Sequence, residues 1–378
     1  MKILVTGSSG FIGKNLIAEL KNRGYDSILA YDKRSTAEQL DAYTKECDFV
    51  FHLAGVNRPK DEKEFMEGNF GFTSTLLEYL KKHKNKTPIL ATSSIQAQLE
   101  NPYGKSKKAG EDLLLSYKQD TEVSVFIYRL PNVFGKWCKP NYNSVVATFC
   151  HNIANELPIN ISSREKAINL VYIDDVVKYF ISELERFMDK EGDNLVRDDK
   201  LNFYQVDPTY TRTLGEVVDL IYSFKESRIS LQIPNLADPF IKKLYSTYTS
   251  YLPTDKFSYP LKMNFDQRGS FTEFIKTIQF GQVSINVSKP GIKKGDHWHH
   301  TKIEKFLVVS GRGIIRFRNA DMESVIEYPV SSDKLEVIDI PVGYIHNITN
   351  TGDSDMVTIM WSNELYDPLN PDTYRMEI

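Results

Sequence analysis

The chain has 378 residues, of which 41% are hydrophobic, and a formal net charge of −3. This length predicts two or three domains with sizeable cores, and the near-neutral charge gives no reason to expect nucleic acid or an anionic membrane as a partner. No apolar run approaches the ~20 residues of a membrane span, and the first strand begins too early for a signal peptide. The cysteines Cys47, Cys138 and Cys150 are odd in number and scattered, so we expect a cytoplasmic protein with reduced thiols.

The N-terminal stretch predicts a buried strand, a glycine turn and a helix. Ile3–Val5 is a short apolar run, and the helical pattern Leu16, Ile17 and Leu20 follows the turn. The turn has the spacing G-x-x-G-x-x-G, at Gly7, Gly10 and Gly13. Such a turn brings backbone N–H groups and a helix N-terminus together, which suits a pyrophosphate; a turn without function is the alternative.

A second strand, Ser27–Tyr31, ends at an acidic residue followed by two basic ones. Asp32 stands about 20 positions beyond the glycine turn, where a carboxylate bonds the adenosine ribose. Lys33 and Arg34 would instead hold a 2′-phosphate, so these residues leave NAD and NADP open. The next strand, Phe49–Gly55, ends in small residues that a flat cofactor could pass.

A further strand ends in the hydroxyl of Ser94, and a helix then opens with Tyr103 and Lys107. Positions i and i+4 share one helix face, so the phenol and the ammonium can meet. A phenol titrates near ~10, and a neighbouring ammonium lowers its pKa. Tyr103 is therefore a candidate to exchange a proton with an oxygen at the carbon that receives hydride, and Ser94 to hold that oxygen.

On these motifs, residues 1 to about 245 resemble an extended short-chain dehydrogenase/reductase of the nucleotide-sugar type. The matching pieces are Thr6–Gly13, His52–Gly55, Asn69, Ser94, Tyr103 with Lys107, Arg129–Gly135 and Val171–Asp175. The resemblance implies that Asn69 supports the proton relay and that Pro131, Asn132 and Val133 border the nicotinamide and the sugar; a structural turn is the alternative for Arg129 and Asn132. It implies these cofactor contacts: Gly7, Gly10, Phe11, Ile12, Gly13, Asp32, Arg34, Leu53, Ala54, Asn69, Tyr103, Lys107, Pro131, Asn132 and Val133.

A domain boundary is expected near residue 252, where the chain becomes rich in tyrosine and serine. The prediction is a doubly wound parallel sheet of Rossmann type over 1–252, followed by an all-β domain over 253–378. The second domain shows short apolar runs between turns, with no helical period. The charged stretch 189–200 between predicted elements is expected to be a solvated loop.

The chemical centre of the second domain is a set of three histidines and one carboxylate. His297 and His299 are two apart, so on a strand they point to the same side. Glu304 is reachable across a hairpin, and His346 can come from another strand. This set suits a divalent metal with open coordination positions, while a neutral hydrogen-bonded cluster is the alternative.

The segments Gly291–Gly311 and Pro341–Asn350 resemble the two cupin motifs, which implies a jelly-roll barrel. The second motif lacks one turn glycine, where Leu335 stands. His300 is expected at the surface. Because Asp266–Phe271 also resembles the deoxysugar 3,5-epimerase branch of cupins, the role of His297 stays open between ligand and base.

The order of the two halves resembles bifunctional capsular-polysaccharide enzymes that form UDP-2-acetamido-2,6-dideoxy-β-L-talose. The resemblance implies a UDP-4-keto-6-deoxy-N-acetylhexosamine substrate, C3 epimerisation in the cupin, C4 reduction by NADPH in the first domain, Zn²⁺ and a homodimer. A proton on carbon 3 is labile only while carbon 4 is a ketone, so inversion must precede reduction. Lys302, Asp296 and Tyr344 are candidates for the proton transfer by proximity alone.

Several alternatives stay open. The cupin could be a non-catalytic sugar-binding module on a nucleotide-sugar epimerase or reductase, or an iron oxygenase, and the metal could be structural. A dinucleotide-binding regulator without enzymatic activity is the remaining class.

Overall fold

The computed structural model describes residues 1–188, 202–319 and 323–378, so the predicted loop 189–200 lies outside the described residues. The chain divides into two compact units, which we call unit 1 (1–221 and 243–252) and unit 2 (222–242 and 253–378). The stretch 222–242 packs with unit 2, whereas the sequence places it in the first predicted domain. None of the helices in the described ranges combines the length and apolarity needed to cross a membrane.

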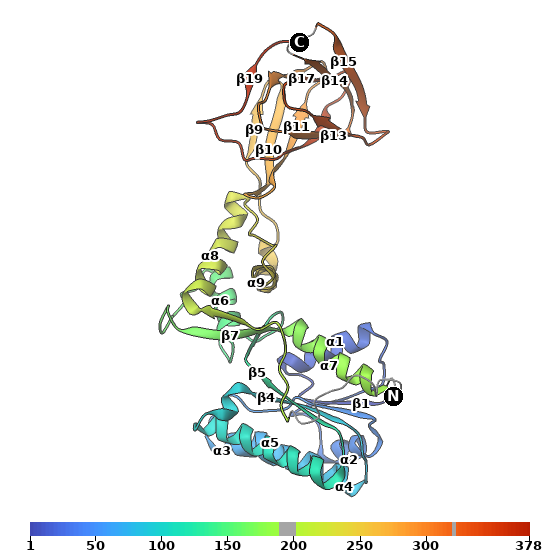
Figure 1. The fold of residues 1–378 in the computed structure, drawn as a ribbon, viewed down its shortest axis with the longest axis vertical. Coiled ribbons are helices and arrows are strands. Elements are labelled where there is room, and N and C mark those ends of the chain that lie inside the picture. The colour runs from blue at the N-terminus through green and yellow to red at the C-terminus, as the bar shows by residue number, and fades with distance from the viewer. Residues whose placement is uncertain (189–201, 320–322) are drawn as a thin grey trace. The chain divides into compact units, whose positions relative to one another are not determined.

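Unit 1 is built on a parallel sheet of order β2-β1-β3-β4-β5. Figure 1 labels β1, β4 and β5 of this sheet. Its strands are β1 (Ile3–Thr6), β2 (Ile28–Tyr31), β3 (Phe49–His52), β4 (Ile89–Ser94) and β5 (Val125–Leu130). Successive residues of a strand face opposite sides, so Ile3 and Val5 pack in one core cluster and Leu4 in another. Burial on both faces explains the short apolar runs of β1 and β3.

Helices cover both faces of this sheet. Residues of α1 (Phe11–Asn22) and α7 (Ile173–Met188) belong to the cluster with Ile3, and residues of α2 (Ala37–Glu46), α4 (Phe72–Lys82) and α5 (Pro102–Thr121) to the cluster with Leu4. Unit 1 also contains α3 (Lys63–Met66), η1 (Glu67–Gly71), η2 (Ile95–Gln98) and α6 (Val145–Ala154). A three-stranded sheet joins β6 (Asn132–Phe134), β7 (Ala167–Tyr172) and β8 (Tyr210–Thr213).

Two further helices, α8 (Leu214–Ser230) and α9 (Pro239–Thr249), contribute to both units, and η4 (Thr254–Lys256) precedes the β-strands of unit 2. These strands pair antiparallel in two sheets, of order β16-β13-β18-β11-β10-β9 and β15-β14-β17-β12-β19. Their bounds are β9 (Met263–Asp266), β10 (Gly269–Thr277), β11 (Gly281–Ser288), β12 (Lys293–Trp298), β13 (Glu304–Ser310), β14 (Arg312–Asn319), β15 (Val325–Ser331), β16 (Val337–Ile340), β17 (Tyr344–Asn350), β18 (Met356–Ser362) and β19 (Tyr374–Arg375).

The core of unit 2 lies between the inner faces of its two sheets. Phe306 of β13 and Met356 of β18 pack there against Ile315, Phe317 and Ile348 of the opposite sheet. The predicted fold class is therefore confirmed: a doubly wound parallel sheet is followed by an antiparallel all-β region.

Candidate active and metal sites

The glycine turn packs closely against the end of β3. Gly7 has a φ of +68°, a left-handed conformation that favours glycine. A Cβ on Gly7 would lie 2.8 Å from the Ala54 nitrogen and 2.9 Å from the Leu53 carbonyl carbon, and one on Gly13 would lie 2.3 Å from the Gly7 oxygen. Gly10 caps α1 without a side-chain hydrogen bond. The first N–H groups of α1, including those of Phe11 and Ile12, therefore lack a side-chain cap and are suited to an anion.

Asp32 and Arg34 line a cavity of about 410 Å³ with Ser8, Ser9, Ser35 and Gln39. The Asp32 carboxylate accepts hydrogen bonds from the Arg34 backbone N–H at 2.9 Å and from its guanidinium at 2.8 Å. These bonds hold the pKa of Asp32 well below its usual range. A carboxylate for ribose hydroxyls and a cation for a 2′-phosphate therefore stand side by side.

Ser94, Tyr103 and Lys107 come together at the end of β4 and the start of α5. The Ser94 hydroxyl accepts the N–H of Gln96 at 3.1 Å and lies near enough to the Tyr103 phenol to lower its pKa. The Lys107 ammonium approaches Gly55 so closely that a Cβ there would lie 3.0 Å from Nζ. Gly55 is thus packed tightly against Lys107 and Asn69, and the passage of a flat cofactor along these small residues stays a prediction.

The electrostatics of this group differ from the expectation that Lys107 lowers the pKa of Tyr103. Burial raises the pKa of the phenol, and the Ser94 hydrogen bond opposes that rise. Burial also lowers the pKa of Lys107 to about 8, with Glu111 acting against it. The reason for the difference is that desolvation, which penalises the charged form of each group, is the largest influence on both pKa values.

Asn69 lies in η1 and serves as a brace for the neighbouring loop. Its amide Nδ2 donates to the Val56 carbonyl at 3.0 Å and to the Ser106 hydroxyl at 2.9 Å, while its Oδ1 accepts the Val56 N–H at 2.9 Å. His52 is packed between the hydroxyls of Thr6 and Thr73, both at 2.9 Å, and burial lowers its pKa to about 3. His52 therefore stays neutral and has a structural role.

Beyond β5, Pro131 leads into β6, where Asn132 and Val133 pair with Leu170 and Val171 of β7. The Asn132 amide donates to the Asn169 carbonyl at 3.1 Å. These contacts anchor the turn that the sequence assigns to the cofactor and sugar site.

Sequence reasoning missed the partner of Arg129. Its guanidinium binds both carboxylate oxygens of Glu111, at 2.8 and 2.6 Å, and stacks on the Phe203 ring at 3.5 Å. Glu111 is buried and stands one helical turn beyond Lys107. The i,i+4 spacing could have placed Glu111 near Lys107, but no local pattern relates Glu111 to Arg129.

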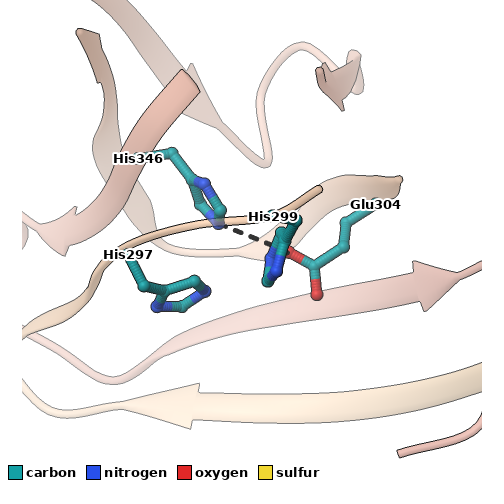
Figure 2. A group of neighbouring side chains, drawn as sticks. All are labelled: His297, His299, Glu304 and His346. Carbon is teal, nitrogen blue, oxygen red and sulfur yellow. Dashed lines mark hydrogen bonds and ion pairs between the residues drawn. The ribbon is translucent and has the colours of Figure 1, made fainter. Parts of the chain in front are cut away.

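His297, His299, Glu304 and His346 converge inside unit 2, with one ligand atom of each within 4.8 Å of the others (Figure 2). His297 lies on β12, His299 just beyond its end, Glu304 at the start of β13 and His346 on β17. Glu304 Oε2 is 3.3 Å from Nε2 of both His299 and His346. We call these four residues the His/Glu cluster.

The imidazoles of the His/Glu cluster are oriented by backbone carbonyls. Nδ1 of His299 hydrogen-bonds the Asp372 carbonyl, and Nδ1 of His346 is 3.3 Å from the Tyr344 carbonyl. With the protons on Nδ1, both Nε2 lone pairs face Glu304, and Nε2 of His346 is buried without a hydrogen-bond partner. That atom lies 3.3 Å from Glu304 Oε2, and a metal ion held by the cluster would use its lone pair.

Charge also fits a cation at this place. Burial and the neighbouring imidazoles lower the pKa of His297 to about 4. The close approach of His299 and His346 holds the pKa of Glu304 well below its usual range against the effect of burial. Three imidazoles and one ionised carboxylate form a donor set that suits a divalent ion such as Zn²⁺.

A cavity of about 400 Å³ adjoins His297 and His346. Lys294, Asn286, Arg268 and Phe271 also line it. Lys294 Nζ donates to Asn286 Oδ1 and to the Val287 carbonyl, both at 2.8 Å.

The candidates for proton transfer expected from sequence lie elsewhere. Asp296 pairs with Lys293 at 2.6 Å, and the Lys302 ammonium donates to Thr373 at 2.9 Å. Asp296, Lys302 and Tyr344 are not among the residues that line the cavity beside His297 and His346. His300 is exposed, as expected.

Comparison with known proteins gives the same two parts. Residues 3–196 match the NAD dependent epimerase/dehydratase family, and residues 264–374 match the polysaccharide biosynthesis C-terminal domain. A UDP-2-acetamido-2,6-beta-L-arabino-hexul-4-ose reductase from Pseudomonas aeruginosa is 44% identical over 378 residues, which cover 100% of this chain and 99% of that protein.

Solved structures agree. The capsular polysaccharide assembling protein CapF from Staphylococcus aureus superposes with a TM-score of 0.90 at 51% identity, covering 100% of both chains. A UDP-glucose 4-epimerase from Thermotoga maritima superposes with a TM-score of 0.54 at 19% identity, over 66% of this chain and 98% of that one, which shows the fold alone.

Proposed function

We propose, from the premise that this chain belongs to the NAD-dependent epimerase/dehydratase family, that it is a bifunctional nucleotide-sugar enzyme. Residues 1–252 would reduce the C4 ketone of a UDP-4-keto-6-deoxy-N-acetylhexosamine with NADPH. Residues 253–378 would first invert carbon 3 of the same sugar. The product would be UDP-2-acetamido-2,6-dideoxy-L-talose, for capsule or other polysaccharide synthesis.

The observation that carries this proposal is the similarity to a UDP-hexul-4-ose reductase along the whole of both chains. A relative that shared only the parallel sheet would support dinucleotide binding and nothing about the β-region. The full-length match, together with the polysaccharide biosynthesis domain, supports a shared substrate for both units.

In the reduction, Tyr103 delivers a proton to the sugar O4 while Ser94 holds that oxygen. The bound dinucleotide supplies the hydride to carbon 4. Lys107 binds the ribose hydroxyls, and its ammonium favours the phenolate that Tyr103 becomes when the proton has left. The alkoxide is thereby neutralised as it forms, and the products are an alcohol and the oxidised dinucleotide.

In the epimerisation, a base removes the C3 proton to give an enolate, and a proton returns to the opposite face. The ketone at carbon 4 makes this proton acidic, so inversion has to precede reduction. A divalent metal held by the His/Glu cluster would act as a Lewis acid on the enolate oxygen. Lys294, held by two acceptors in the adjoining cavity, is placed to balance the same negative charge.

One experiment tests both steps with the intact chain. The UDP-4-ketosugar is incubated in D₂O without reductant, and deuterium at carbon 3 is measured by mass spectrometry and NMR. NADPH is then added and the reduced product is characterised. Deuterium uptake followed by reduction is expected. Reduction without deuterium uptake at carbon 3 would contradict the proposed epimerisation. It would favour a reductase whose β-region only binds sugar.

The cofactor and the metal are proposed as NADPH and Zn²⁺, in a cytoplasmic homodimer without a nucleic-acid or membrane partner. Arg34 beside the ribose cavity supports the 2′-phosphate, and Arg34→Ala should lower the preference for NADPH over NADH about tenfold. Comparing kcat/KM with the two dinucleotides checks this. Oxygen consumption by an iron-loaded sample would instead favour an oxygenase.

A further inference from the structure

The segment after β18 reaches the loop that carries two residues of the His/Glu cluster. This loop, residues 299–304, contains His299 and Glu304 and joins β12 to β13. Asp372 meets it through both its backbone and its side chain. Nδ1 of His299 hydrogen-bonds the Asp372 carbonyl, which fixes the direction of the imidazole.

The Asp372 carboxylate lies in a concave arrangement of three successive backbone N–H groups. Oδ1 accepts the N–H of His300 at 2.9 Å, and Oδ2 accepts those of Thr301 at 2.7 Å and Lys302 at 2.8 Å. The Thr301 hydroxyl adds a fourth bond, at 3.1 Å. Successive N–H groups of this kind make an anion site, and here the anion is a side chain of the protein itself.

Other contacts hold the same segment in place. Tyr374 and Arg375 of β19 pair with Trp298 and His297 of β12, and the Met376 N–H donates to the Asp296 carbonyl at 3.0 Å. The segment that carries Asp372 is therefore held by its own contacts with β12. Asp372 can thus determine the position of the loop that it binds.

We propose that Asp372 is a positioning residue for metal binding: it sets the loop that carries His299 and Glu304 and orients the His299 imidazole. This inference rests on the metal site of the proposed function. The loop has to hold two ligand atoms within one coordination shell. Its two ends are tied by the Gly343 N–H to the His299 carbonyl at 3.0 Å and by the Asn363 N–H to the Ile303 carbonyl at 3.2 Å, and Asp372 holds the N–H groups between them. Partners that orient metal ligands are worth about 10–100-fold in metal affinity.

The test uses the full-length protein with Co²⁺ or Zn²⁺ as the probe. Asp372→Ala should weaken Zn²⁺ binding about 10–100-fold in competition with a chromophoric chelator. It should also change the visible absorption of the Co²⁺ form, because the ligand geometry loosens. Asp372→Asn keeps the shape and one oxygen, so its affinity should lie between those of the wild type and Asp372→Ala.

Asp367→Asn is the matched control, because the Asp367 carboxylate bonds only Leu369 and Asn370 of its own segment. This variant should bind Zn²⁺ as the wild type does. If Asp372→Ala does not fold, as judged by circular dichroism, Asp372→Asn decides the question.

The outcomes separate the inference from its premise. Wild-type affinity and an unchanged Co²⁺ spectrum in both Asp372 variants would overturn the positioning role and leave the metal site standing. A wild-type protein that binds neither ion would overturn the metal site and the positioning role together.

Discussion

The residues of the proposed reductase site come from one strand and the helix that follows it, whereas the His/Glu cluster also needs His346 from a distant strand. Ser94, Tyr103 and Lys107 follow one another along β4 and α5. The His/Glu cluster draws on β12, β13 and β17 and is oriented by the carbonyl of Asp372. The first site thus depends on helix spacing, and the second on strand register and on contacts across the sequence.

The two sites also leave different groups in need of a ligand. In unit 1, the buried cation Lys107 has lost part of its hydration, and its pKa is lowered to about 8. In unit 2, Nε2 of His346 is buried without a hydrogen bond among the described residues, although it lies 3.3 Å from Glu304 Oε2. Anionic or hydroxyl groups of a dinucleotide would satisfy the first, and a metal ion the second. Variants should therefore separate the two activities.

The largest effect is expected from removing a member of the His/Glu cluster. His346→Ala should abolish stoichiometric Zn²⁺ binding and C3 deuterium exchange, because it removes the buried Nε2. Reduction of an already epimerised ketosugar should persist. Metal analysis and NMR check this, with the exposed His300→Ala as control. Equal exchange in both variants would contradict a catalytic cluster.

Tyr103→Phe should reduce ketone reduction by about 10²–10⁴-fold, the usual contribution of a positioned proton donor. C3 exchange should be unchanged, because it takes place in unit 2. The oxidation of NADPH is followed at saturating substrate, and deuterium uptake is measured on the same sample. Loss of both activities together would break the separation of the two sites.

Lys294→Met should lower C3 exchange by about 10–100-fold while metal content is retained, because it removes a cation beside the enolate. Lys293→Met is a matched control, since Lys293 forms an exposed ion pair with Asp296. Exchange rates at equal metal occupancy check the prediction. A similar rate in the two variants would assign the charge stabilisation to the cluster alone.

The smallest expected effect is on stability. A lysine of ordinary pKa near 10.5 binds a proton in the unfolded chain, whereas folded Lys107 loses it above about pH 8. The unfolded state therefore binds more protons between these values, so the cost of burying this charge is present below about pH 8 and is lost as pH rises. Lys107→Met should raise the free energy of unfolding at pH 7 by ~1–3 kcal/mol.

The gain in Lys107→Met should disappear near pH 10.5, and denaturant titrations at pH 7 and 10 measure the difference. Lys105→Met is the control, because Lys105 is exposed beside Glu100. A gain that is the same at both pH values would contradict a titrating origin.

Much of the fold could be predicted because the apolar patterns are local. The buried runs of β1, β3 and β4 and the short strands of unit 2 follow directly from residue order. The position of Lys294 in the cavity could not be predicted in this way, because on a regular strand Lys294 and His297 would point to opposite faces of the sheet. A bulge lies between Gly295 and His297, with Asp296 at a φ of +58°, and both side chains consequently reach the cavity.

Asp372 was also beyond sequence reasoning, since its partners lie about 70 residues earlier and are backbone N–H groups that carry no residue signal. The raised pKa of Tyr103 was also beyond sequence reasoning, because its cause is burial in the folded protein. Spacing predicted the neighbouring ammonium, but the extent of burial depends on the packed structure.

Three imidazoles and one carboxylate do not discriminate strongly among first-row divalent metals. Intrinsic affinities rise from Mn²⁺ to Cu²⁺ and fall again at Zn²⁺, whatever the protein prefers for catalysis. The ion found in purified protein would then reflect the growth medium and the chromatography resin. Nickel-affinity purification in particular could load the cluster with an inactive occupant, and activity comparisons should begin from protein stripped and refilled with a defined metal.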